Sequence, residues 1–134
     1  MTHYYPVQIF YEDTDAAGIV YHANYIKYLE RARTTLLQQK GLSLPALIDT
    51  FGIQFVVRAV NITFEKPAKL QQNIIVATNM SKHGKASLVF KQDIYFDPMD
   101  MDTMICSGEV VVVCVNQQFK PCAIPSVVIK ELKE

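Results

Sequence analysis

The first residues of the chain alternate between positions that suit a buried face and positions that suit an exposed one. Between Tyr5 and Tyr11, the residues Val7, Ile9 and Tyr11 stand at every second position. This spacing predicts a β-strand. Residues 12–18 are acidic or small, which predicts a loop.

The spacing of apolar residues then lengthens to three or four, from about Ala23 to Lys40. That spacing predicts a long amphipathic helix, and Gly41 is suited to end it. Residues 43–50 predict a second, short helix with Ser43 as its cap. The side chains expected to form the buried stripe of the long helix are Ile26, Leu29, Ala32 and Leu36.

After Gly52 the period of two returns in four segments that are separated by turn-forming residues. The segment at 60–64 is expected to bury Val60, Ile62 and Phe64. The last segment, Met104 to Val115, is apolar at nearly every position and predicts a buried strand. The other two segments lie at about 74–80 and 86–96, and residues 126–133 predict a short final helix.

The order of these elements predicts the fold class. One strand, one long helix and four strands with short connections favour an antiparallel sheet wrapped around one long central helix, an α+β fold. A length of 134 residues suits a single domain that covers residues 1–134. Because such a sheet leaves a face and edges uncovered, we expect a homo-oligomer.

Composition narrows the function classes. The formal net charge is zero, so no overall field attracts nucleic acid or an anionic membrane. Three cysteines without a C-x-x-C pair argue against a disulfide framework and a zinc site, and favour a reducing compartment. Residues 110–115 form the longest apolar run, too short for a transmembrane helix. With no signal peptide recognisable at the start, we expect a cytoplasmic protein that binds no metal.

Candidate chemistry concentrates in residues 11–25, YEDTDAAGIVYHANY, which join the first strand to the long helix. A helix N-terminus presents free N–H groups that can polarise a carbonyl, and Asp15 just before it could attack that carbonyl or activate water. Gly18 would allow a tight turn between the two. The alternative is structural, because acids before a helix commonly cap it, and Glu30 within the helix is expected to pair with a neighbouring Lys27, Arg31 or Arg33.

The stretch YEDTDAAGIVYHANYIKYLERAR resembles the signature of the YbgC-like group in the 4-hydroxybenzoyl-CoA thioesterase family of hotdog proteins. The segments FVVRAVNITFEKPAKL and VVVVCVN…KPCAIP extend the resemblance over nearly the whole chain. The resemblance implies that Asp15, the second aspartate of D-x-D, is the catalytic carboxylate. It also implies that the backbone N–H near His22 polarises the thioester carbonyl, and a histidine at this position is typical of the YbgC-like acyl-CoA thioesterases.

A second cluster follows the turn at His83-Gly84. The resemblance places phosphate-binding residues in this hairpin, where Lys82, Lys85 and Ser87 would contact coenzyme A. The alternative is a solvated turn whose lysines aid solubility. Tyr25 is expected either to line the acyl pocket or simply to pack the helix. Arg58 interrupts an apolar alternation, so it could face a groove or a subunit contact; we favour an exposed charge at a strand edge.

Together these observations predict an acyl-CoA thioesterase that releases a free acid and CoA, with no cofactor because a thioester is already activated. The resemblance implies a dimer as the minimal unit, sites between subunits, and commonly a homotetramer. Two alternatives remain open: hydration or dehydration of an acyl thioester, and a binding module for acyl-CoA or acyl carrier protein linked to envelope lipid metabolism.

Overall fold

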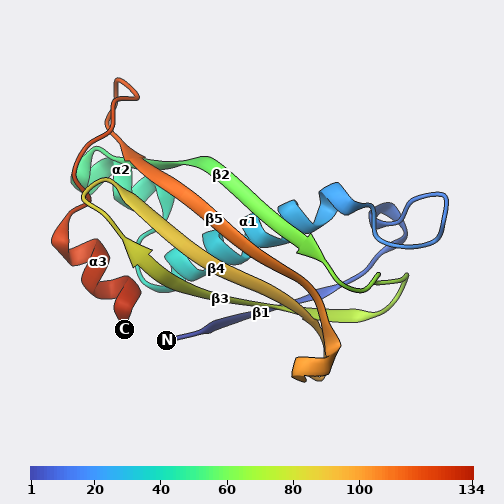
Figure 1. The fold of residues 1–134 in the computed structure, drawn as a ribbon. Helices are drawn as coiled ribbons and strands as arrows, with labels where there is room; N and C mark the ends of the chain where they lie inside the picture. Colours follow the sequence, from blue (N-terminus) through green and yellow to red (C-terminus); the bar gives the residue numbers. More distant parts are fainter.

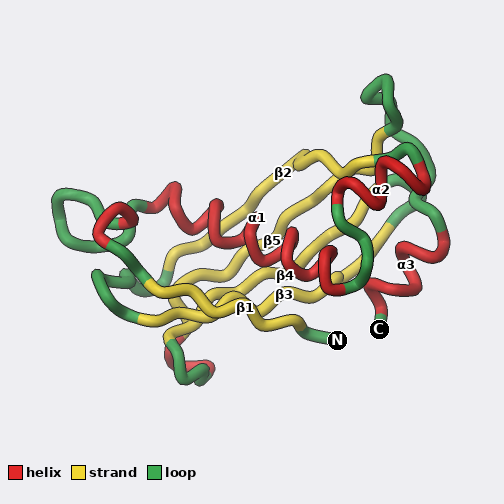
Figure 2. Tube along the Cα trace, turned by 180° about the vertical axis from the view of Figure 1, so that it is seen from behind, coloured by secondary structure: helices red, strands yellow, loops and turns green.

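The computed structural model describes residues 1–134, apart from the side chain of Met101. Five antiparallel strands form one sheet in the order β1-β3-β4-β5-β2. The long helix α1 lies along one face of this sheet (Figures 1 and 2). The elements are β1 (His3–Gln8), a 3₁₀ turn (Tyr11–Asp13), α1 (His22–Gln39), α2 (Leu44–Phe51), β2 (Gln54–Phe64), β3 (Asn73–His83), β4 (Ser87–Phe96), a 3₁₀ turn (Met101–Thr103), β5 (Met104–Val115) and α3 (Ser126–Lys133).

The predicted α+β class and the helix-on-sheet arrangement are confirmed. The observed bounds of α1 lie within one residue of the predicted ones, and Ser43 caps α2 by accepting a hydrogen bond from the Ala46 N–H. One strand prediction is wrong at its end, because β1 stops at Gln8 and Tyr11 starts a 3₁₀ turn with its side chain exposed.

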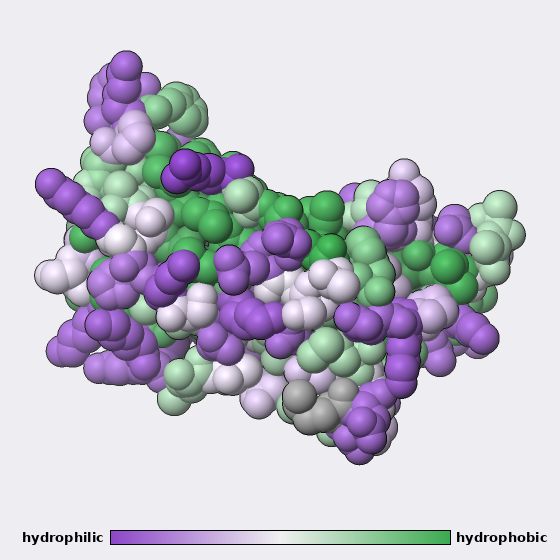
Figure 3. Space-filling view, viewed as in Figure 1, coloured by the Kyte–Doolittle hydropathy of each residue, from purple (hydrophilic) through white to green (hydrophobic). Residues whose placement is uncertain are grey.

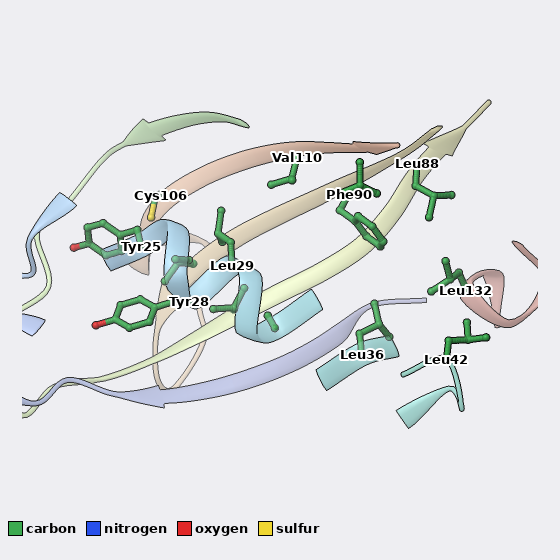
Figure 4. Close-up of a cluster of buried hydrophobic side chains, with 14 of the residues drawn as sticks. Tyr25, Tyr28, Leu29, Leu36, Leu42, Leu88, Phe90, Cys106, Val110 and Leu132 are labelled. Carbon is green, nitrogen blue, oxygen red and sulfur yellow. The ribbon is translucent and has the colours of Figure 1, made fainter. Parts of the chain in front are cut away.

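The stripe predicted for α1 is only partly right. Leu29, Ala32 and Leu36 are buried, but Ile26 is 45% exposed. The buried face is rotated toward Tyr25 and Tyr28, which fill the core near the start of the helix (Figure 4). Aromatic side chains are longer than aliphatic ones, so Tyr25 and Tyr28 fill the core from a face of α1. The 3.6-residue period alone does not identify that face as the buried one.

The predicted burial of β2 is wrong for two of its three residues. Val60 is 37% and Phe64 is 49% exposed, and only Ile62 packs against the core. The reason is position, because β2 crosses to the far edge of the sheet, beside β5, where its outer side has no neighbouring strand in the described chain. Arg58 is exposed, as expected, and sits at a β-bulge on this edge.

The core between α1 and the sheet is tightly packed at Gly108 of β5. A β-carbon added there would lie 2.9 Å from the Gln92 carbonyl oxygen and 3.3 Å from Leu29 Cδ1. Any larger residue would therefore press on the backbone of β4 and on Leu29 of α1, and would disturb both the strand pairing and the helix position. Glycine at this position fixes how closely the helix approaches β5.

A buried polar network crosses the same layer. Arg33 Nη1 donates to Gln92 Oε1 over 2.9 Å, and Gln92 Nε2 donates to the Leu29 carbonyl oxygen and to Thr78 Oγ1. Burial lowers the pKa of Arg33, and the charge of Glu30 partly offsets this. Gln92 is therefore the hydrogen-bonding partner that makes a buried guanidinium tolerable in this core.

The cysteines are free, as expected from the sequence. Burial raises the pKa of Cys106 to about 12. Burial and the neighbouring Cys122 likewise raise the pKa of Cys114 to about 12. Such thiols carry almost no thiolate at neutral pH, so neither is suited to be a nucleophile.

We predict that Gln92→Leu lowers the free energy of unfolding by about 3 kcal/mol, because it leaves the buried Arg33 without its partner. The double variant Arg33→Met, Gln92→Leu should be more stable than the sum of the single variants predicts. Urea denaturation of all four proteins measures this coupling, and strict additivity would contradict the network.

Candidate active site

Asp15 lies at the tip of a small hairpin between β1 and α1. Thr14 and Val20 form a bridge, and the Gly18 N–H donates to the Asp15 carbonyl oxygen over 3.0 Å. Gly18 has a φ of +81°, which other residues adopt only with strain, so its predicted role in a tight turn is confirmed. The hairpin therefore presents Asp15 on a backbone fixed from both sides.

The Asp15 carboxylate is exposed, and only one of its two oxygens accepts a hydrogen bond from its own turn. Its Oδ1 accepts a hydrogen bond from the Ala17 N–H over 2.8 Å. Among the described residues, no group donates to its Oδ2. One oxygen orients the side chain while the other is available for chemistry.

Asp13, two residues earlier, has the opposite environment, because its carboxylate is buried and both of its oxygens accept hydrogen bonds. It is only 8% exposed, its Oδ1 accepts from Asn24 Nδ2 over 3.0 Å, and its Oδ2 accepts from the Phe10 N–H over 2.9 Å. Its carbonyl oxygen also accepts from the Tyr21 N–H. Sequence reasoning did not single out Asp13, although it belongs to the same D-x-D motif, because nothing in the pattern shows which acid is buried.

The N-terminus of α1 begins at His22 and has no side-chain cap. The Tyr21 N–H is used by Asp13 and the Asn24 N–H by the Tyr21 carbonyl, whereas the N–H groups of His22 and Ala23 have no acceptor among the described residues. Uncapped N–H groups at a helix start favour a partial negative charge.

His22 forms part of an apolar hollow of about 260 Å³ at this end of the sheet. Its exposed ring lies edge-on to Phe64, with ring centroids 6.4 Å apart. Tyr25 lies deeper, 4% exposed and 5.6 Å from Phe64 between centroids. The lining is Ile19, Val20, His22, Tyr25, Phe64, Glu65, Lys66 and Pro67.

The alternatives for Tyr25 turn out to be compatible, because it both lines the hollow and packs the core. Its hydroxyl oxygen accepts a hydrogen bond from the buried Ala68 N–H over 3.2 Å. Burial raises the pKa of Tyr25, so the phenol stays protonated. The hydroxyl thus joins α1 to the segment that follows β2.

Asp15 does not line this hollow. It lies instead in an open basin of about 570 Å³ with Tyr11, Thr14 and Leu70. Glu30 is further along α1 and forms no ion pair among the described residues; it accepts a hydrogen bond from Thr34 Oγ1 over 2.7 Å. The expected pairing of Glu30 with a neighbouring cation is found only as the action of its charge on Arg33, without a direct salt bridge.

Lys82, Lys85 and Ser87 lie at the opposite end of the sheet, in the β3–β4 hairpin (Figure 1). Ser87 pairs with Val113 of β5, whereas Phe64 pairs with Cys106, seven residues away along the same strand. Seven residues of strand span about 23 Å. A single chain therefore does not bring the lysines and the Asp15 hairpin together.

The part of the chain that the structure describes contains no group of His, Cys, Asp or Glu suited to hold a metal ion. Within those residues, no helix is both long and apolar enough to cross a membrane.

We predict that Tyr25→Phe lowers the free energy of unfolding by about 1–3 kcal/mol, because the buried Ala68 N–H loses its acceptor. Tyr21→Phe, which removes a hydroxyl from a half-exposed ring, is the matched control and should change stability little. Urea denaturation measures both, and an equal effect of the two substitutions would contradict this role of the Tyr25 hydroxyl.

Comparison with known proteins places the chain in a family. The model of the thioesterase-like superfamily matches residues 11–132. The acyl-CoA thioester hydrolase YbgC of Escherichia coli O6:H1 is 38% identical over 131 residues, covering 97% of this chain and 95% of the relative. The acyl-CoA thioesterase YbgC of Haemophilus influenzae is 36% identical, covering 96% and 90%.

The fold is shared with solved structures. The 1,4-dihydroxy-2-naphthoyl-CoA thioesterase from Synechocystis has a TM-score of 0.89 at 19% identity, and the alignment covers 100% of this chain and 97% of that one. At this identity the likeness concerns the fold, which is the hotdog fold predicted from the sequence. The chain therefore belongs to the thioesterase-like superfamily, within which it is a thioester hydrolase of the YbgC type.

Proposed function

We propose that this protein hydrolyses acyl-CoA thioesters to a free carboxylic acid and CoA, with Asp15 as the catalytic carboxylate. The observation that carries the proposal is the Asp15 hairpin itself. It holds one carboxylate oxygen by the Ala17 N–H, leaves the other free, and leads directly into a helix N-terminus without a cap. The YbgC relatives named above are acyl-CoA thioesterases, which supports the same substrate class.

In this mechanism the thioester carbonyl oxygen approaches the N–H groups at the start of α1, near His22. These donors stabilise the negative charge that develops on that oxygen. Asp15 either attacks the carbonyl carbon or removes a proton from the water that attacks it. When Asp15 attacks, loss of the CoA thiolate leaves an acyl anhydride on Asp15, and water then cleaves that anhydride to the free acid and the Asp15 carboxylate. When water attacks, the carbon–sulfur bond breaks to give the free acid directly. In both routes the CoA thiolate takes up a proton that the water supplies. The chemistry requires no cofactor or metal.

The hollow beside His22 would receive the start of the acyl chain. Tyr25 and Phe64 give it aromatic walls, and Pro67 closes one side. The His22 ring, exposed at the mouth, would orient the thioester or the attacking water. Gly18 contributes through its backbone, because its N–H donates to the Asp15 carbonyl oxygen and closes the turn that carries Asp15.

A second copy of the chain completes the proposed site. The outer edge of β2 carries exposed Val56, Val57 and Val60, and Figure 3 shows a hydrophobic band along this strand. An apolar strand edge is readily extended by another strand. Two identical strands related by a two-fold axis pair antiparallel, so the Gln54 end of one β2 meets the Phe64 end of the other.

This pairing would bring the hairpin of one copy toward the Asp15 end of its partner. Lys82 and Lys85 would then contact the phosphates of CoA, with Ser87 beside them, while the thioester reaches Asp15 of the other copy. The dimer is thus the minimal active unit. Acyl-CoA as the substrate also agrees with the expected cytoplasmic location.

We predict that Asp15→Asn lowers kcat by at least about a hundredfold with little change in fold, because it removes both nucleophilicity and basicity while keeping the shape. His22→Ala should cost less, since the backbone N–H remains. Steady-state hydrolysis of acyl-CoAs of graded chain length measures both. If wild type binds acyl-CoA but does not hydrolyse it, the protein is a binding module instead.

A second prediction concerns mixed dimers of Asp15→Asn with the double variant Lys82→Ala, Lys85→Ala. The lysine variant alone should raise KM for acyl-CoA with kcat nearly unchanged, because a phosphate contact is the same in ground and transition states. One site of the mixed dimer carries both changes and the other carries neither. Its activity at low substrate should therefore be about half that of wild type.

Dimers purified by two different affinity tags provide the measurement, with both homodimers as controls. Activity no higher than the mean of the two homodimers would contradict a site built from two copies.

A further inference from the structure

Asp13 is a nearly buried carboxylate with no ion pair among the described residues. Burying an acid without a counter-charge is costly. The cost is offset here by neutral donors, since Asn24 Nδ2 and the Phe10 N–H each occupy one carboxylate oxygen. A group that is expensive to bury, and that the proposed mechanism does not use, requires a separate explanation.

The donor pattern suits an acid at this position. An ionised carboxylate accepts hydrogen bonds at both oxygens. Asp13 accepts simultaneously from the end of the β1 segment, at Phe10, and from the first turn of α1, at Asn24. Tyr28 lies beside it, and its pKa is raised by burial and by interaction with the Asp13 carboxylate.

The backbone of Asp13 adds a third connection. Its carbonyl oxygen accepts from the N–H of Tyr21, the residue immediately before α1. Residues 13 and 21 thus close the base of the hairpin whose tip carries Asp15. The carboxylate and the carbonyl together fix where the free N–H groups of His22 and Ala23 lie relative to that tip.

We propose that Asp13 is a positioning residue that, through Asn24, locks the N-terminus of α1 against the Asp15 hairpin. This inference rests on the proposed function of Asp15 and extends it to a second acid with a different role. Small displacements of reacting groups reduce the rate strongly. Loss of the lock therefore lowers kcat, whereas binding of CoA at the distant hairpin, and with it KM, changes little.

The test exchanges the two side chains. Asn24→Asp sets two carboxylates against each other with no donor between them, so kcat should fall by at least about tenfold. Adding Asp13→Asn restores the pattern, because the amide introduced at position 13 then donates to the new carboxylate and still accepts from the Phe10 N–H. The exchanged charge also lies in the first turn of α1, where the dipole favours it.

The double variant should recover kcat to within about threefold of wild type, with KM constant throughout. Asn24→Ala, which keeps the acid and removes one donor, should give an intermediate kcat and serves if Asn24→Asp does not fold. The matched control is Asp93→Asn, which removes a carboxylate paired with Lys91 at 2.6 Å on the other face of the sheet. It should lower the melting temperature without lowering kcat.

The outcomes separate the two claims. A kcat of Asn24→Asp equal to wild type, or a double variant that regains its melting temperature but not its kcat, overturns the positioning role. If Asn24→Asp slows the enzyme and the exchange rescues it, the role is supported. Near-normal turnover of Asp15→Asn defeats the proposed catalytic carboxylate itself, whatever Asp13 does.

Discussion

The bare edge of β2 is the constraint on which the rest of this molecule depends. The chain covers one face of its sheet with α1, but among the described residues it has no further strand to place beside β2, whose valines remain exposed. The chain also separates its candidate chemistry, with Asp15 at one end of the sheet and the lysine hairpin at the other. A second copy paired with β2 about a two-fold axis would cover the bare edge. Because the two strands would run in opposite directions, it would also bring the lysine hairpin of one copy toward Asp15 of the other.

The end of the molecule that carries the candidate site is built by hydrogen bonds and not by hydrophobic packing alone. A short hairpin, closed by Thr14–Val20 pairing and by Asp13, carries Asp15 on its tip and leads into a helix start without a cap. The two acids of the motif have opposite environments, one buried and fully bonded, one exposed with a free oxygen. Under the proposed function, one acid would support and the other would react, a division that suits precise placement of a catalytic group.

The sequence predicted the bounds of helices and strands better than it predicted which of their side chains are buried. The bounds of β5 and α3 agree with the prediction, because a continuous apolar run and a proline-preceded amphipathic segment are strong local signals. The exposure of Phe64 and Ile26 was not predictable, since it depends on β2 lying at an edge and on which side of α1 meets the sheet. The same holds for Asp13, whose burial follows from an irregular loop that no period describes. Asp15, His22 and Gly18 could be proposed as site residues from the sequence because the motif that contains them is itself local.

The central claim is that one catalytic site takes residues from two copies of this chain. The most direct measurement is a crystal structure with a thioether analogue of acyl-CoA, in which the sulfur is bonded to CH₂ in place of the carbonyl and cannot be hydrolysed. The account predicts a β2-to-β2 dimer with the CoA phosphates against Lys82 and Lys85 of one subunit and the thioether beside Asp15 of the other. An analogue bound wholly within one subunit, or with its thioether remote from Asp15, would contradict it.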